Sequence, residues 1–138
     1  MLRALTPLLF LAACASGGAN APTPPSPSLN EEFTLAPGQS ATVNGTNVRL
    51  TFDRVKEDSR CPTDVTCIWE GDAVVVLKVK VEAEEATREL HTQGGDTRSR
   101  KARAGDYMVT LVRLDPAPRS TAPIEASAYR ATLLVARE

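Results

Sequence analysis

Residues 73–83 read Ala-Val-Val-Val-Leu-Lys-Val-Lys-Val-Glu-Ala, and this stretch decides the fold class. Every odd-numbered position is apolar and the later even-numbered positions are charged, which is the period of a strand with one buried face. Val74 and Val76 make the first half of the stretch apolar on both faces, so we expect both faces of that half to be covered. The pattern predicts a central strand of an antiparallel sheet.

The region upstream predicts a hairpin that precedes this strand. Apolar and polar side chains alternate over residues 47–54, which is typical of a half-buried strand. Asn44 and Gly45 both tolerate positive φ and predict a two-residue turn from a short strand at residues 41–43. Val55 breaks the alternation, which indicates a bulge.

Further strands are expected on either side of this hairpin, where short runs with period-two alternation are bounded by turn-forming residues. These runs are residues 33–35, 86–92, 107–114 and 129–135. Residues 93–104 have no apolar period and are predicted to form an exposed loop.

Roughly seven or eight short strands and no long helix place residues 31–138 in the all-β class. We expect an antiparallel two-sheet sandwich of immunoglobulin-like architecture, because the length fits such a domain. A small β-barrel is the alternative.

The N-terminus carries an export signal. Residues 1–13 combine a positive end with an apolar core that closes in small residues. An apolar run of about 10 residues spans about 15 Å as a helix, half of a bilayer core of about 30 Å, so a permanent transmembrane anchor is not expected. Leu11-Ala12-Ala13-Cys14 resembles the lipobox of bacterial lipoproteins, in which the cysteine is acylated and becomes the first residue of the mature chain. The resemblance implies that Cys14 is lipidated and attaches the protein to the membrane.

Residues 14–30 are predicted to form a tether that begins at the lipidated cysteine. This segment is rich in Pro, Ser and Gly and has too few large apolar side chains to offset the entropy of ordering. An extended polyproline-like form would reach about 50 Å. Ala15 stands where an Asp would favour retention in the inner membrane of many bacteria, so the expected location is the bacterial cell envelope, on the outer membrane facing the periplasm.

The cysteine loop, residues 58–71, holds the other two cysteines and the only tryptophan. In an oxidising compartment Cys61 and Cys67 should form a disulfide. Their spacing is wider than a redox Cys-x-x-Cys motif, and His91 is the only histidine, so neither a redox pair nor a zinc cluster is expected. Trp69 is either a core anchor beside the disulfide or an exposed recognition residue, and we expect the core position.

Six carboxylates lie in or near the cysteine loop and raise two chemical alternatives, a calcium site and a glycosidase acid–base pair. No spacing resembles an EF-hand loop, and neighbouring Arg and Lys residues offer ion-pair partners. A serine-type triad would have only His91 and no nucleophile elbow. We therefore expect no metal, no cofactor and no enzymatic activity.

Seven charged residues make up the candidate binding surface. They are Arg60, Asp64 and Glu70 in the cysteine loop, and Arg98, Arg100, Lys101 and Arg103 in a basic run. The basic run could meet lipid phosphates or an acidic polymer, and a solvated loop is the competing interpretation. A formal net charge of -1 provides no field that would select nucleic acid, so no nucleic-acid partner is expected.

Two short motifs carry a family resemblance. The segments Asp58-Ser59-Arg60-Cys61-Pro62 and Cys67-Ile68-Trp69-Glu70-Gly71 precede the valine-rich strand. This order resembles a group of small, uncharacterised bacterial secreted proteins and lipoproteins, in which an Asp-Ser-Arg-Cys-Pro motif and a Cys-x-Trp-x-Gly motif recur before a strand. The resemblance covers most of residues 31–138 and implies no activity.

Together these features predict a membrane-anchored, non-catalytic binding or envelope-associated module. Its expected partners are the membrane, through the N-terminal lipid, and an envelope protein or glycan. One alternative is a periplasmic inhibitor of a protease or lysozyme that displays the cysteine loop. The other is a hydrolase that uses loop carboxylates.

Overall fold

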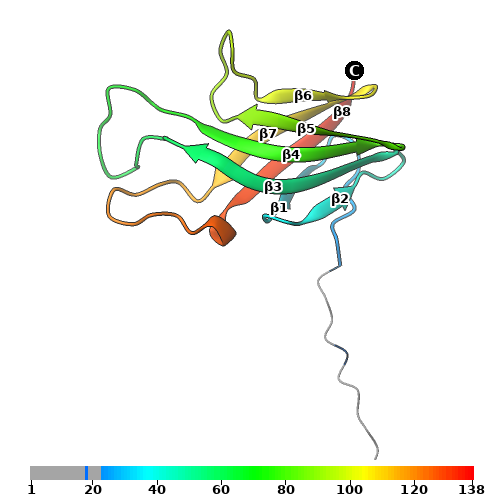
Figure 1. Cartoon of the computed structure of the whole chain (residues 1–138), viewed down its shortest axis with the longest axis horizontal. Coiled ribbons are helices and arrows are strands. Elements are labelled where there is room, and N and C mark those ends of the chain that lie inside the picture. The colour runs from blue at the N-terminus through cyan, green and yellow to red at the C-terminus, as the bar shows by residue number, and fades with distance from the viewer. Residues whose placement is uncertain (1–17, 19–22) are drawn as a thin grey trace, which may run out of the picture.

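The computed structural model describes Gly18 and residues 23–138, so the predicted signal peptide and Cys14 lie outside the described residues. Within the described part of the chain, no helix is long and apolar enough to cross a membrane. The chain forms an all-β domain with a single short 3₁₀ helix among the described residues (Figure 1).

Eight strands make two antiparallel sheets. They are β1 (Glu32–Leu35), β2 (Ser40–Thr42), β3 (Val48–Asp58), β4 (Ala73–Val81), β5 (Glu84–His91), β6 (Lys101–Ala104), β7 (Tyr107–Asp115) and β8 (Arg130–Arg137), with the 3₁₀ helix η1 (Ala126–Ala128) before β8. One sheet has the order β1-β8-β7-β6 and the other has the order β2-β3-β4-β5.

The two sheets pack around one apolar core. Phe52 and Leu50 project into it from one sheet, and Leu111 and Leu133 project into it from the other, all fully buried. The antiparallel two-sheet sandwich is confirmed, and the sheets are not closed into a barrel. The layering of two packed antiparallel sheets is that of the expected immunoglobulin-like architecture. The strand order is that of two meanders, with β1 added beside β8.

The valine-rich strand β4 lies inside its sheet, as predicted. Val74 and Val76 lie outside the main core cluster, yet they are only 6% and 1% exposed. Lys56 Nζ on β3 lies 2.9 Å from Glu89 Oε1 on β5. Because β4 runs between those two strands, this ion pair crosses the outer face of β4, and the long side chains cover apolar surface there.

The turn before β3 differs from the prediction. Val43 N donates to Val48 O at 3.0 Å and Thr46 N donates to Val43 O at 3.2 Å, so residues 44–47 form a four-residue loop instead of a two-residue turn. Gly45 has φ +73°, which suits the third position of a type II turn. Farther along β3, the register shifts on either side of Val55 confirm the predicted irregularity.

Part of the predicted loop at residues 93–104 is a strand, which corrects the prediction. Residues Lys101–Ala104 form β6 and pair with β7. Ala102 and Ala104 are the less exposed positions, and Lys101 and Arg103 are exposed. The alternation was not recognised because alanine contributes little hydropathy contrast to a period-two pattern.

The connections between strands gather at two opposite ends of the sandwich (Figure 1). The turns that join β2 to β3, β4 to β5 and β6 to β7 lie at one end, the proximal pole, where Glu82 N donates to Asn47 O. The loops at residues 59–72, 92–100 and 116–129 lie at the other end, the distal pole. Strand β3 runs between the poles with 11 residues, which corresponds to about 35 Å.

The last residues of the predicted tether pack on the proximal pole. Pro27 is buried and its carbonyl accepts a hydrogen bond from Asn44 N at 2.8 Å. Asn30 N donates to Val135 O at 2.8 Å. Contacts with the sandwich therefore begin before the predicted boundary at Glu31, and the chain enters the domain at the end opposite the cysteine loop.

Candidate binding site at the distal pole

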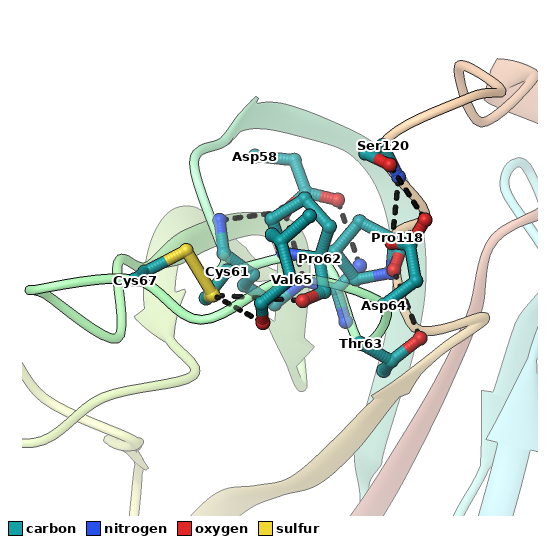
Figure 2. Close-up of a disulfide and its surroundings, with 10 residues drawn as sticks. Asp58, Cys61, Pro62, Thr63, Asp64, Val65, Cys67, Pro118 and Ser120 are labelled. Carbon is teal, nitrogen blue, oxygen red and sulfur yellow. Dashed lines mark hydrogen bonds and ion pairs between the residues drawn. A yellow bond between two sulfur atoms is a disulfide. The ribbon is translucent and has the colours of Figure 1, made fainter.

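The cysteine loop stands on an extension of the β3–β4 hairpin. Beyond the strand ends, Ser59 N donates to Asp72 O at 2.7 Å and Cys61 N donates to Glu70 O at 2.8 Å. Cys61 and Cys67 form the predicted disulfide, with their Cα atoms 5.9 Å apart (Figure 2). Closing so short a loop contributes about 2 kcal/mol on the chain-entropy model, so the main effect of the disulfide is to hold the loop in one shape.

Gly71 lies where the two chain segments of this extension, residues 59–61 and 70–72, approach each other closely. Its φ is +69°, and a Cβ added there would lie 1.8 Å from the carbonyl oxygen of Ser59. Only glycine satisfies both constraints. Backbone geometry thus explains the glycine that ends the Cys-x-Trp-x-Gly motif.

Arg60 ties the base of the cysteine loop to the connection between β7 and β8. Its Nε and Nη2 donate to the two carboxylate oxygens of Asp58 at 2.8 and 2.7 Å. The same guanidinium donates to Leu114 O at 2.7 Å and to Pro116 O at 2.9 Å. Tyr129 completes the group by donating its hydroxyl to Asp58 Oδ2 at 2.9 Å. We call Asp58, Arg60 and Tyr129 the clasp.

The electrostatics of the clasp fix the direction of its hydrogen bonds. Burial raises the pKa of Asp58, but hydrogen bonds from Arg60 and Tyr129 and the charge of Arg60 outweigh it, so this pKa lies below its usual value. Burial and the hydrogen bond to Asp58 raise the pKa of Tyr129 to about 12. At neutral pH Asp58 is therefore an ionised acceptor and Tyr129 a protonated donor.

The far part of the cysteine loop is fastened to the loop at residues 116–129 (Figure 2). Ser120 donates its backbone N and its hydroxyl to the two carboxylate oxygens of Asp64, at 2.9 and 2.5 Å. Thr63 N donates to Pro118 O at 3.0 Å. The hydrogen bonds from Ser120 hold the pKa of Asp64 below its usual value.

These contacts change the interpretation of two predicted binding residues. The prediction that Arg60 is exposed is wrong, because its side chain is only 13% exposed and its donors are used inside the protein. Asp64 is exposed, but both of its carboxylate oxygens already accept hydrogen bonds. Both residues shape the loop.

Trp69 lies at the surface, which corrects the expected core position. Its exposed fraction is 81%, that of Ile68 is 92% and that of Val65 is 45%, and these are the large hydrophobic side chains exposed in the described chain. A disulfide between residues six apart closes a surface loop and does not bridge two sheets that pack about 10 Å apart. No core therefore lies beneath Trp69.

A surface depression of about 560 Å³, the distal pocket, lies between the cysteine loop and the loop at residues 92–100. Its lining includes Ile68, Trp69 and Glu70 from the first loop and Gln93 and Arg98 from the second. The volume falls in the range of small-molecule sites, about 300–1,000 Å³. The fold thus brings two of the predicted binding residues, Glu70 and Arg98, to one site.

Asp72 forms a closed hydrogen-bond network at the bottom of the pocket. Its Oδ1 accepts hydrogen bonds from Thr92 Oγ1 and Gln93 N, both at 3.0 Å. Its Oδ2 lies 2.5 Å from Nδ1 of His91. His91 is far from the cysteine loop in the sequence, but the fold brings it next to the loop. Burial raises the pKa of Asp72, but these hydrogen bonds outweigh it and leave that pKa below its usual value. Ser59 Oγ donates to the backbone carbonyl of Asp72 at 2.9 Å and is also committed.

The side chains around the rim of the pocket, in contrast, are not engaged in hydrogen bonds within the described part of the protein. Among the described residues, none provides a hydrogen-bond partner for the side chains of Glu70, Gln93 or Arg98. Sequence reasoning missed Gln93, because a glutamine in a polar loop carries no signal until the fold places it next to Trp69.

The predicted basic run does not form one patch. Arg98 lines the distal pocket, whereas Arg100 uses its guanidinium to donate to Leu111 O at 3.1 Å and Val112 O at 2.5 Å. Arg103 lies 2.5 Å from a carboxylate oxygen of Glu138, near the proximal pole. Strand alternation and these internal bonds disperse the cations.

The partly buried Asp58 and the buried Asp72 predict a loss of stability in acid. The pKa values of Asp58 and Asp72 are lower in the folded protein than in the unfolded chain, where they are about 3.9. The unfolded chain therefore binds more protons in acid, so the stabilisation is present above about pH 5 and is lost as the pH falls through the folded pKa values. Urea unfolding between pH 2 and 7 should show this decrease.

An Asp58→Asn variant provides the control for this prediction. It should be less stable than the parent at pH 7, and the difference should shrink in acid because the parent then loses the same charge. A parent and a variant with parallel pH profiles would contradict the assignment to Asp58.

Within the described residues there is no group of three or more His, Cys, Asp or Glu side chains that could hold a metal ion. Comparisons with protein-family models, curated proteins and solved structures found no match for this chain.

Proposed function

We propose that the protein is a lipid-anchored, extracytoplasmic lipoprotein of the bacterial cell envelope that acts as a non-catalytic binding module. It holds its partner at the distal pole, on the cysteine loop. The observation that carries this proposal is the exposure of Ile68 and Trp69, at 92% and 81%, on a loop closed by a disulfide.

Exposed apolar side chains in such a setting support recognition. Tryptophan is among the residues that most often dominate binding energy at interfaces. The disulfide and the clasp hold the loop before a partner arrives, which lowers the entropy lost on binding. An exposed Trp69 on a loop that is held in one conformation supports a recognition role.

The placement of the tether supports the same proposal. The chain joins the proximal pole, and the residues between Cys14 and Ser26 reach about 35–40 Å when extended. Together with β3, about 35 Å long, they would hold the distal pole about 70 Å from a lipid surface. The loop then faces away from its own membrane and toward other envelope components.

The lipid anchor is tested by replacing Cys14 with serine. Without the acylated cysteine we expect the protein to move from the membrane fraction to the soluble extracytoplasmic fraction, because no other anchor is proposed. Fractionation followed by immunoblotting measures the change. A variant that stays in the membrane fraction would refute the anchor.

The binding role is tested with the exposed pair. Purified protein should retain a component of envelope extract, and the double variant Ile68→Ser/Trp69→Ser should retain at least about tenfold less. The matched control is Glu84→Ser/Glu85→Ser, which changes two exposed residues at the proximal pole and should retain the parent amount. Equal retention by all three proteins would remove the cysteine loop as the binding site.

One alternative shares this loop, because a disulfide-closed, exposed loop also suits a periplasmic inhibitor of a protease or lysozyme. Inhibition assays with the same variants address it. The hydrolase alternative has less support, since Asp72, His91 and Ser59 are engaged with one another and with the backbone. Turnover of glycan or peptide substrates that Glu70→Gln abolishes would overturn the non-catalytic proposal.

A further inference from the structure

We propose that the distal pocket is a saccharide-binding site, with Trp69 as the stacking surface and Glu70, Gln93 and Arg98 as the hydrogen-bonding groups. The inference rests on the proposed binding role of the cysteine loop and names its ligand class, a neutral oligosaccharide of plain or N-acetylated hexoses.

The apolar part of the site is formed by Trp69 and its neighbour Ile68, next to polar groups. Trp69 lines the pocket and remains 81% exposed, so its indole is accessible to a ligand. Tryptophan combines a large apolar face with an N–H donor and suits a ligand that is apolar on one side and hydrated on the other. A pyranose ring has this character, because its C–H groups form apolar faces and its hydroxyls lie around the edge.

The polar part matches a ring of hydroxyls. Glu70 offers acceptors, Arg98 offers donors and the Gln93 amide offers both. None of these side chains has a hydrogen-bond partner among the described residues, whereas Asp72 and Ser59 below them are occupied. The pocket therefore has a rigid bottom and free hydrogen-bonding groups around its rim.

The charge balance selects a neutral ligand. Glu70 and Arg98 carry opposite charges on opposite loops, and the Asp72 carboxylate is engaged with His91 at the bottom. A phosphate or an acidic polymer would meet the Glu70 carboxylate. A neutral sugar can use both the acceptor and the donor.

Location and size disfavour other ligands. The pocket lies at the pole opposite the tether, so headgroups of the anchoring membrane are not the expected ligand. Its volume of about 560 Å³ and its mixture of polar and apolar lining residues suit a few sugar rings better than a wholly apolar small molecule. A protein partner would also use Val65, the exposed hydrophobic residue of the cysteine loop that does not line the pocket.

The test uses Trp69 itself, because it is the only tryptophan in the chain and its fluorescence reports on this site. The purified, oxidised protein is titrated with chitotetraose and with cellotetraose. We expect a saturable change in tryptophan emission with at least one of them, with half-saturation at about 1 mM or below.

Three variants locate the binding, with affinities measured by calorimetry where the tryptophan is absent. Trp69→Ala should weaken binding at least about tenfold and Gln93→Ala at least about fivefold. Val65→Ala is the matched control, which shortens an exposed apolar side chain of the same loop outside the pocket and should change affinity less than about twofold. All three positions lie at the surface or rim, so melting temperatures should match that of the parent.

Two outcomes overturn the inference. One is the absence of a saturable response to both sugars up to about 10 mM. The other is a loss of affinity on Val65→Ala as large as that on Trp69→Ala. In either case retention of an envelope component that depends on Ile68 and Trp69 would leave the proposed binding function standing with a protein partner. Loss of that retention as well would remove both.

Discussion

Replacing Gly71 with alanine should lower the free energy of unfolding by about 3–4 kcal/mol, the largest effect that we expect from a single methyl group in this protein. The left-handed backbone at φ +69° costs a non-glycine residue about 1–2 kcal/mol. The new Cβ would also lie 1.8 Å from Ser59 O. This is a backbone atom, so it can move away only if the two hydrogen-bonded segments at the base of the loop separate. Overpacking of this kind adds about 1–3 kcal/mol.

Urea unfolding of oxidised Gly71→Ala against the parent measures this effect. Gly94→Ala is the matched control, since Gly94 lines the same pocket but an added Cβ there meets nothing within 4 Å. The control should change stability by less than about 0.5 kcal/mol. If Gly71→Ala costs less than about 1 kcal/mol, the close approach of the two segments is not a constraint.

Removing the Arg60 side chain should cost about 3 kcal/mol. Arg60→Ala leaves the Asp58 carboxylate, whose side chain is 11% exposed, without its paired charge, and breaking a buried ion pair typically costs about 3–5 kcal/mol. It also leaves Leu114 O and Pro116 O without the donors that join the cysteine loop to the β7–β8 connection. Partial exposure and the remaining bond from Tyr129 place the expected value at the lower end of that range.

Arg60→Lys and Arg98→Ala are the informative comparisons for this prediction. Lysine keeps the charge but has no planar fork for both Asp58 oxygens, so most of the loss should persist. Arg98→Ala removes an exposed guanidinium and should change the unfolding free energy by less than about 0.5 kcal/mol. A small effect of Arg60→Ala, equal to that of Arg98→Ala, would show that the clasp does not stabilise the fold.

Much of the sandwich could be predicted from local pattern. Four strands follow a period of two: the valine-rich strand, the strand before the cysteine loop and the two C-terminal strands. In each of them the apolar face predicted from the sequence is the buried face. The disulfide could also be predicted, because spacing and compartment are enough to pair two cysteines. Strand β6 was not predicted, because the alanines on its less exposed face, Ala102 and Ala104, are too weakly hydrophobic to produce a clear alternating pattern.

The candidate site could be predicted only in part, because it depends on contacts between distant segments. The motif marked the right loop, but sequence alone could not show that Arg60 turns inward to Asp58 and Leu114. The same holds for Trp69, whose exposure depends on whether any core lies beneath the disulfide.

The sequence by itself determined the fold class, the strands with strong alternation and the pairing of Cys61 with Cys67. These properties depend on neighbours within a few residues, where steric and hydrophobic periodicity act directly. The tertiary structure alone decided that Trp69 faces solvent, that Gln93 and Arg98 lie beside it, and that the tether enters at the opposite pole. The physical reason is that each of these facts depends on how strands far apart in the chain pair and pack, which no local pattern encodes.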